Sequence, residues 1–167
     1  TDTEIIPHLY QECGEDFVDH INGMFAISLW DSRRKKLILA RDRFGEKPLY
    51  YGVFDGKLLY ASEPKALLAH PSVRAELDLD ALRHYLSYDY VPAPRSIYKG
   101  ISKLPAAHVL TVENGEMRTR QYWKLDWSNT LQKPAREQGR YNHLGEKATE
   151  LHDLLSDAVR MRLVSDV

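Results

Sequence analysis

The sequence predicts an α+β fold built from antiparallel hairpins and separate helices. Pairs of apolar runs are joined by short polar turns at residues 31–36, 55–56 and 114–115. The last two turns are Asp-Gly and Asn-Gly, which strongly indicate β-hairpins because both positions accept positive φ. In the segments around the hairpins, apolar residues recur at helical spacing instead. Hairpins with segregated helices are typical of the α+β class.

The first 22 residues are predicted to be helical, and Gly14 is expected to divide them into two helices. The spacing of Thr1 and Glu4 is that of a capping box, in which a hydroxyl and a carboxylate satisfy free backbone amides. Pro7 lacks an amide donor, and the first turn of a helix tolerates this loss. We therefore expect a helix to begin close to the first residues.

Apolar runs then predict three hairpins in succession. The expected strands are residues 24–30, 37–40, 49–54, 57–61, 106–112 and 116–123. Residues 24–30 are almost continuously apolar, which predicts burial on both faces of that strand. The hairpins follow one another along the chain, so an antiparallel arrangement is expected.

Helices are also predicted at residues 65–69, 78–88 and 143–163. Apolar residues gather on one side of the 78–88 helix. They form a stripe of helical period along the 143–163 helix. Residues 126–142 are polar and aperiodic, which favours a linker before the last helix.

At 167 residues the chain is long enough for one domain with a fragment of a second. Hydrophobic residues form 43% and charged residues 28% of the chain, and the net charge is −1. This composition indicates a soluble globular protein without the field that attracts nucleic acid. No apolar run approaches the ~20 residues of a membrane span. Cys13 is the single cysteine, which fits a reducing, cytoplasmic location.

Both ends of the chain are abrupt. Thr1 to Glu4 form a helix start with no methionine or signal segment before them. Residues 162–167 resemble the lead-in to a strand. We therefore expect the chain to be a middle piece of a larger protein, whose most diagnostic groups lie outside these residues.

Spacing yields few catalytic patterns. Cys13 could act as a nucleophile with His8 or His20 nearby, but no known local signature surrounds it. A buried, inert thiol is therefore favoured. The histidines lack the spacing of metal ligands, so a zinc site is not expected.

Charged segments have structural interpretations. The acidic cluster within residues 12–16 and the basic turn at residues 33–36 are interpreted as solvated faces. The run R-D-R-F-G at residues 41–45 is interpreted as a strand end followed by a turn. Gly45 is expected to take positive φ there, with Arg–Asp pairs fixing the turn.

Asp2 lies in the first turn of the opening helix, where unpaired amides and the helix dipole favour an anion. Its carboxylate can stabilise the helix by about 0.5 kcal/mol. It can also act as a rigidly held group that grips an ammonium ion. Position by itself favours the first role and leaves the second open.

Several short runs occur in a characteristic order. They are T-D-T-E-I-I (1–6), N-G-M-F-A (22–26), R-D-R-F-G (41–45), K-P-L-Y-Y (47–51), A-S-E-P-K-A-L (61–67), Y-V-P-A-P-R-S-I (90–97), K-L-P (103–105), Y-W (122–123) and R-L-V-S-D-V (162–167). Together they resemble the glutamine-hydrolysing asparagine synthetase family. The resemblance covers about residues 1–125 and 143–167.

The resemblance implies a two-domain parent protein. Its first domain would be a class II glutaminase with an N-terminal nucleophile, the Ntn-hydrolase αββα sandwich. There a cysteine attacks glutamine and an Asn-Gly pair holds the oxyanion. Its second, an α/β ATP-pyrophosphatase domain, would use ATP and Mg²⁺ to activate aspartate for attack by ammonia. Residues 1–125 would be the C-terminal half of the first domain, 126–142 a linker, and 143–167 the first helix of the second.

One binding residue transfers from the family to this chain. Asp2 matches the aspartate that binds the α-ammonium group of glutamine. The family's cysteine and ATP loop are absent from the sequence. The oxyanion Asn-Gly pair is absent too, because Asn114 and Gly115 lie in the wrong hairpin. Motif residues within 41–48 receive structural roles. The chain by itself is therefore expected to be inactive and to bind neither ATP nor Mg²⁺.

Partners follow from the same resemblance. The parent is expected to use glutamine, aspartate and ATP, to be a homodimer, and to bind neither nucleic acid nor membrane. Related synthetases of the same architecture, such as β-lactam synthetases or sugar-modifying amidotransferases, are a second interpretation. A non-catalytic scaffold that kept the sandwich is a third. The sequence leaves the ammonia acceptor open.

Overall fold

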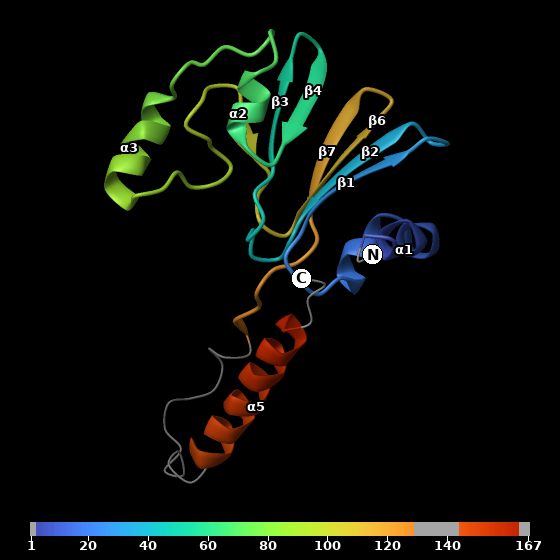
Figure 1. Cartoon of the computed structure of the whole chain (residues 1–167), viewed down its shortest axis with the longest axis vertical. Coiled ribbons are helices and arrows are strands. Elements are labelled where there is room, and N and C mark those ends of the chain that lie inside the picture. The colour runs from blue at the N-terminus through green and yellow to red at the C-terminus, as the bar shows by residue number, and fades with distance from the viewer. Residues whose placement is uncertain (1–2, 129–143, 164–167) are drawn as a thin grey trace. The chain divides into compact units, whose positions relative to one another are not determined.

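The computed structural model describes residues 3–128 and 144–163 of the chain. By its internal contacts the chain divides into two compact units, Thr1–Leu125 and Asp126–Val167. In the described part of the first unit, antiparallel sheets are accompanied by separate helices (Figure 1). The predicted α+β class is thereby confirmed.

The larger sheet among the described residues has the strand order β1-β2-β6-β7, and all its neighbouring strands are antiparallel. Its strands are β1 Ala26–Asp31, β2 Lys36–Arg41, β6 His108–Glu113 and β7 Glu116–Gln121. Leu39 of β2 lies opposite Ser28 of β1 and Leu110 of β6. The first and third predicted hairpins therefore join in one sheet.

The smaller sheet, within the described ranges, has the order β4-β3-β5. β3 Tyr50–Phe54 and β4 Lys57–Ala61 form the second predicted hairpin. β5 Ser102–Lys103 pairs with Tyr50 and Tyr51. The sequence did not predict β5, because two residues are too few to reveal a period.

Helices cover one face of the larger sheet. α1 (Ile5–Cys13) and the 3₁₀ helix η1 (Gly14–His20) pack there, with Phe17 buried against Ile38 and Ala40 of β2. Each fully buried side chain of the size of Phe17 or Ile38 contributes about 1.5–3 kcal/mol relative to an exposed one. Apolar burial therefore holds this helical layer on the sheet.

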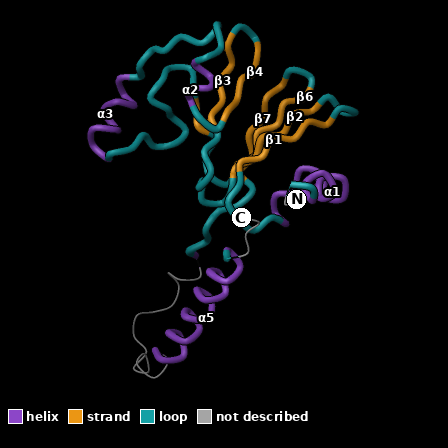
Figure 2. Tube along the Cα trace, viewed as in Figure 1, coloured by secondary structure: helices purple, strands orange, loops and turns teal. Residues whose placement is uncertain are grey.

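The opposite face of the larger sheet packs against the smaller sheet through Leu39 of β2 and Tyr51 of β3. Tyr50, on the other face of β3, packs instead with Leu67 of α2 (Pro64–Leu68). The layers therefore follow the order helix, sheet, sheet, helix. Figure 2 shows the two groups of strands, in orange, meeting at one end and splaying apart toward their hairpin tips.

α1 begins later than the sequence predicts, because its N-cap is Glu4, whereas the expected capping box makes Thr1 the N-cap and Glu4 the third helical residue. α1 begins at Ile5, so Pro7 lies in its first turn. Gly14 has a φ of 60°, and the chain continues beyond it as η1, which confirms the predicted division. Thr1, half of the predicted capping box, lies outside the described residues.

The dipeptide turns of the second and third hairpins are also confirmed. Asp55 and Gly56 have φ values of 49° and 72°, and Asn114 and Gly115 have values of 53° and 80°. Positive φ at both central residues is the type I′ pattern, whose twist matches that of the adjoining strands.

The prediction that residues 24–30 are buried on both faces is wrong. Ile27 of β1 is buried beneath the helices, whereas Trp30 on the other face is 58% exposed. β1 is an edge strand, and the smaller sheet reaches this face at Ser28, whose hydroxyl donates to Tyr60 Oη at 2.9 Å. An apolar side chain on this face of β1 is therefore not necessarily buried, because the two sheets splay apart here.

The predicted helix near residues 78–88 is confirmed as α3, Leu79–Tyr88. The carboxylate of Asp78 accepts bonds from two backbone amides of its first turn, which caps the helix. Ala81 is buried, but Leu79 is 66% and Leu86 is 74% exposed. The apolar side that the sequence marks on this helix is therefore largely uncovered.

In the second unit, helix α5 spans Leu144–Arg162, which confirms the helix expected at residues 143–163. Leu151 and Leu155 of its apolar stripe are each 58% exposed. Residues 129–142 of the expected linker lie outside the described part of the chain, and the domain assignment stays a prediction. Across the described ranges, no helix combines the length and the apolar character that crossing a membrane requires.

Candidate functional site

A hollow of about 630 Å³ opens beside the start of α1. We call it the α1 hollow. Its walls are the first turn of α1, the segment 21–27 that leads from η1 into β1, and the pair Lys47 and Pro48. Ser62, which follows β4, adds a hydroxyl, while Ile5 adds apolar surface. A mostly apolar concavity with a few polar groups is typical of a small-molecule site.

Asp42 holds two of these walls together. Its side chain is 1% exposed. The carboxylate accepts backbone N–H bonds from Phe25 at 3.3 Å, Phe44 at 3.1 Å, Glu46 at 2.9 Å and Lys47 at 3.0 Å. Phe25 and Lys47 are themselves lining residues of the α1 hollow. One buried anion therefore joins two segments of the site.

The charge of Asp42 follows from two opposing causes. Burial by itself raises the pKa of this carboxyl, because the anion loses its water. The backbone amides, led by that of Lys47, act in the opposite direction and hold the pKa of Asp42 below its ordinary value. Asp42 is therefore an ionised structural group at neutral pH, and not a proton donor.

The turn after β2 is confirmed, but the predicted means of holding it is wrong. Gly45 has a φ of 68° as expected. Instead of pairing with Asp42, the guanidinium of Arg41 donates to the backbone carbonyls of Gly45 at 2.6 Å, Lys47 at 2.7 Å and Leu104 at 2.7 Å. A buried carboxylate and a guanidinium each need several partners, and the backbone supplies them here.

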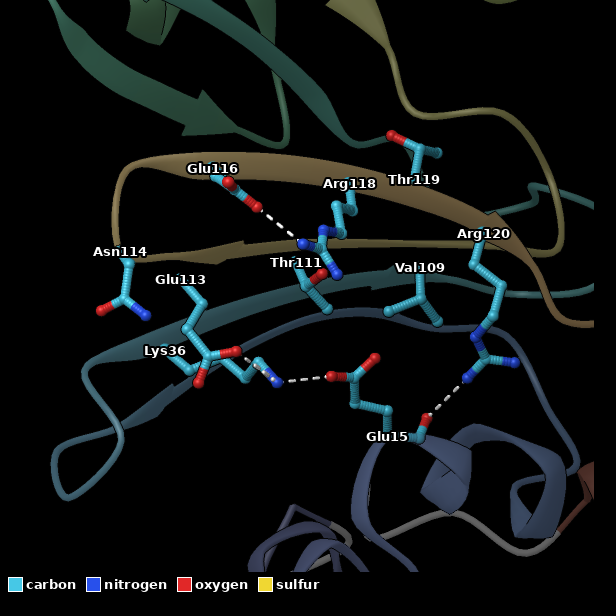
Figure 3. Close-up of a pocket in the computed structure, with 10 residues that line it drawn as sticks. All are labelled: Glu15, Lys36, Val109, Thr111, Glu113, Asn114, Glu116, Arg118, Thr119 and Arg120. Atoms are coloured by element: carbon cyan, nitrogen blue, oxygen red, sulfur yellow. Dashed lines mark hydrogen bonds and ion pairs between the residues drawn. The ribbon is translucent and has the colours of Figure 1, made fainter.

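A second hollow of about 470 Å³ lies on the larger sheet beside β6 and β7 (Figure 3). Lys36, which is 8% exposed, lies between two carboxylates. Its Nζ is 2.5 Å from Glu15 of η1 and 3.1 Å from Glu113 of β6. The remaining ion pairs of this hollow are Arg118–Glu116 and Arg120–Asp16. Each charge has a partner, which favours a structural role over ligand binding.

Lys36 and Glu15 also correct the sequence interpretation. The sequence pattern places both on solvated faces, yet their ion pair ties η1 to β2. The hydrogen bond from Glu15 is the main cause that raises the pKa of Lys36, so the charge persists at neutral pH. The two residues are 21 positions apart, and no local pattern pairs them.

Cys13 is half-buried and packs beside the core around Phe17, so the expectation of a buried thiol is met in part. Neither Cys13 nor any histidine lines the described part of the α1 hollow. In the portions of the chain that are described, no group of three His, Cys, Asp or Glu side chains is arranged to hold a metal ion.

Asp2, the binding residue expected from the family resemblance, lies outside the described residues. Its role therefore stays a prediction. The next residue along the chain, Thr3, lines the α1 hollow.

Comparison with known families and proteins identifies the family to which this site belongs. Residues 1–123 match the family described as glutamine amidotransferase domain. The chain belongs to this glutamine amidotransferase family. The resemblance to glutamine-hydrolysing asparagine synthetases is confirmed, and the α1 hollow lies within the matched residues.

Individual relatives match the whole chain. It is 35% identical to asparagine synthetase (glutamine-hydrolyzing) 3 of Bacillus subtilis, over 100% of the chain and 26% of that protein. It is 33% identical to asparagine synthetase B (glutamine-hydrolyzing) of Escherichia coli, over 100% and 24%. It is 35% identical to the amidase chyE of Penicillium rubens, again over 100% and 24%. The chain thus spans about a quarter of the length of these relatives.

Sequence reasoning missed the connection between the walls of the α1 hollow. It recognised the runs at residues 22–26 and 41–48 but assigned the second a structural role. An aspartate that precedes a glycine-containing turn is a known signal for capture of backbone amides. That signal could have indicated the local bonds of Asp42, but not the bond to Phe25, which is 17 residues away.

Proposed function

We propose that this chain is the C-terminal half of the glutaminase domain of an ATP-dependent amidotransferase. The parent enzyme makes asparagine from aspartate and from ammonia that is released from glutamine. The family match supports glutamine as the nitrogen donor. Two relatives named as glutamine-hydrolyzing asparagine synthetases support the product.

The observation that carries the proposal is the α1 hollow, which is lined by Thr3 and by the first residues of α1. The carboxylate of Asp2 pairs with the α-ammonium group of glutamine, a charge-assisted contact that fixes the amino-acid end of the substrate. The apolar walls then contact its methylene groups. This arrangement suits an amino acid that has a charged α-ammonium group and a short run of methylene groups.

The remaining chemistry belongs to other segments of the parent. A cysteine of the parent attacks the side-chain amide of glutamine. An Asn-Gly pair stabilises the oxyanion of the tetrahedral intermediate. We place both in the segment of the parent that precedes these residues. The isolated chain is therefore inactive. The helix, sheet, sheet, helix order of layers supports an Ntn-hydrolase sandwich that the preceding segment completes.

Helix α5 is, in this proposal, the first helix of the ATP-pyrophosphatase domain. That domain binds ATP and Mg²⁺ and activates aspartate, and we assign no residue of this chain to either. A homodimeric, cytoplasmic parent completes the proposal.

A second function has support from relatives that are named amidases. The amidase chyE of Penicillium rubens matches the chain as well as the synthetases do. An amidotransferase with the same glutaminase half and an acceptor other than aspartate is therefore the alternative. Assaying the full-length protein with glutamine, aspartate and ATP distinguishes the two, because the alternative forms no asparagine.

The Asp2→Asn variant of the full-length protein tests the role of Asp2. Loss of a charge-assisted bond of about 1.5–3 kcal/mol should raise KM for glutamine roughly 10- to 150-fold. Synthesis from free ammonia should stay unchanged, because ammonia bypasses glutamine binding. Both rates are measured by product formation.

Asp55→Asn, in the exposed β3–β4 turn, is the matched control and should leave both rates unchanged. An equal loss with both nitrogen donors would show that Asp2 only supports the fold.

A further inference from the structure

We propose that Asp42 is a positioning residue for glutamine, because it sets the spacing of the walls of the α1 hollow. The inference rests on the proposed glutaminase function. Asp42 lines no part of the hollow itself. It acts through Phe25 on one wall and Lys47 on another, whose amides both donate to its Oδ2.

The main chain of Asp42 reinforces the link to the first wall. Its N–H donates to the carbonyl of Phe25 at 3.0 Å, so the two residues exchange a pair of bonds through backbone and side chain. Its carbonyl accepts from Gly45 at 3.1 Å and from Ala107 at 2.8 Å. Asp42 is therefore bonded to three separate stretches of the chain.

Arg41 reinforces the link to the second wall. Its Nε donates to the carbonyl of Lys47, while its Nη atoms reach Gly45 and Leu104. Lys47 is thus held at its N–H by Asp42 and at its carbonyl by Arg41. A wall residue bonded at both backbone groups has little freedom to shift relative to β2.

Gly45 makes this close arrangement possible. A Cβ added at Gly45 would lie 3.1 Å from Ala106 Cβ and 3.1 Å from the guanidinium carbon of Arg41, and the φ of 68° disfavours a side chain. The turn can therefore wrap tightly around the two side chains that join the walls.

Spacing matters because substrate positioning is sensitive to small displacements. A misplacement of about 1 Å can cost about 100-fold in rate. An amide in place of the Asp42 carboxylate turns one acceptor oxygen into a donor, which then faces backbone donors. The walls near Phe25 and Lys47 would separate, while the reacting groups of the parent stay in place.

The test is Asp42→Asn in the full-length protein, with KM for glutamine and the ammonia-supported rate measured together. We expect KM for glutamine to rise about tenfold and the rate with saturating ammonia to remain within about twofold per folded molecule. A variant that merely folds less well would lose maximal rate with both donors and keep its KM.

Asp31→Asn is the matched control. Asp31 also accepts two backbone amides in a hairpin turn, those of Arg33 and Arg34, but it does not line or contact the α1 hollow. Its replacement should leave KM for glutamine unchanged. Arg41→Lys is a second variant for the case in which Asp42→Asn does not fold, and it should raise KM in the same direction.

Hydrogen exchange gives a readout that does not require activity. Asp42→Asn should speed exchange within residues 21–27 and at Lys47 together, whereas Asp31→Asn should not. If the walls keep their protection, or KM keeps its wild-type value in folded Asp42→Asn or Arg41→Lys protein, the inference is wrong. Absence of glutamine hydrolysis in the wild-type full-length protein would instead overturn the proposed function, and exchange would still decide the role of Asp42.

Discussion

Tyr122 brings a hydroxyl into the same backbone network as Asp42. Its Oη donates to the carbonyl of Arg41 at 3.0 Å. Burial raises the pKa of Tyr122 to about 12, and the nearby charge of Asp42 adds to this effect. The hydroxyl of Tyr122 therefore keeps this bond and its raised pKa only while the turn after β2 is intact.

This raised pKa predicts a loss of stability in alkali. An unfolded tyrosine has a pKa of about 10, whereas folded Tyr122 has a value of about 12. The folded state therefore keeps the proton longer, and the stabilisation is lost as pH rises from about 10 to about 12. Tyr122→Phe should show a shallower decline of unfolding free energy over this range, measured by urea unfolding at several pH values.

At neutral pH the same variant should be less stable by about 1 kcal/mol, since the Arg41 carbonyl loses a donor. Tyr60→Phe, whose hydroxyl bonds to Ser28 at a more exposed position, is the control. Identical alkaline slopes for wild type and Tyr122→Phe would contradict the assignment.

Residues differ in how far the sequence could predict them. The positive φ of Gly45 was predictable, because a turn directly after a strand favours glycine. The bond between Asp42 and Phe25 was not, because the two residues are 17 positions apart and meet only in the folded chain.

Among the elements, η1 is tied to the larger sheet by an ion pair that its sequence does not suggest. Its Glu15 reaches Lys36 of β2 across 21 residues. The side chain of Lys36 is 10% exposed and that of Glu15 is 36% exposed, so water screens this pair less than a surface pair. The pair therefore helps to hold the helical layer on the larger sheet.

Lys36→Met should lower the free energy of unfolding by about 2 kcal/mol, because it leaves Glu15 and Glu113 facing each other without a cation. In a double-mutant cycle with Glu15→Gln, the coupling energy should exceed about 0.5 kcal/mol. The exposed pair Arg118–Glu116 is the control, and its coupling should stay below about 0.5 kcal/mol. Both cycles are measured by urea unfolding, and equal couplings would argue against a special role for Lys36.

Local sequence patterns predict some features of the helices and strands and fail to predict others. The hairpin turns followed from Asp-Gly and Asn-Gly, and helix α3 followed from apolar residues at helical spacing, which are patterns within short stretches of the chain. The exposure of Trp30 and the pairing of β5 did not follow. Both depend on which strands lie beside which, and that information is not contained in any short window.

In the first unit as a whole, apolar side chains remain uncovered where the two sheets splay apart. Trp30 of β1 is 58% exposed and Val53 of β3 is 56% exposed. Exposed apolar surface can mark an interaction site where it forms a large contiguous patch. The proposed completion of the sandwich by a preceding segment accounts for it.

Oxidative footprinting tests that account on the isolated chain and on the longer parent. Trp30 should react several-fold more slowly in the parent, because added strands would cover it. Trp127, which is 60% exposed and belongs to the second unit, serves as an internal comparison within each sample. Equal reactivity of Trp30 in the two proteins would contradict the proposed completion.

The sequence by itself determined the hairpins, the helix positions and the family, because turn dipeptides, helical periods and ordered motifs are written in consecutive residues. Only the tertiary structure decided that Lys36 is buried, that Trp30 is exposed, and that Asp42 joins Phe25 to Lys47 behind the α1 hollow. Each of these depends on residues far apart in the chain, which acquire their environment when the layers pack.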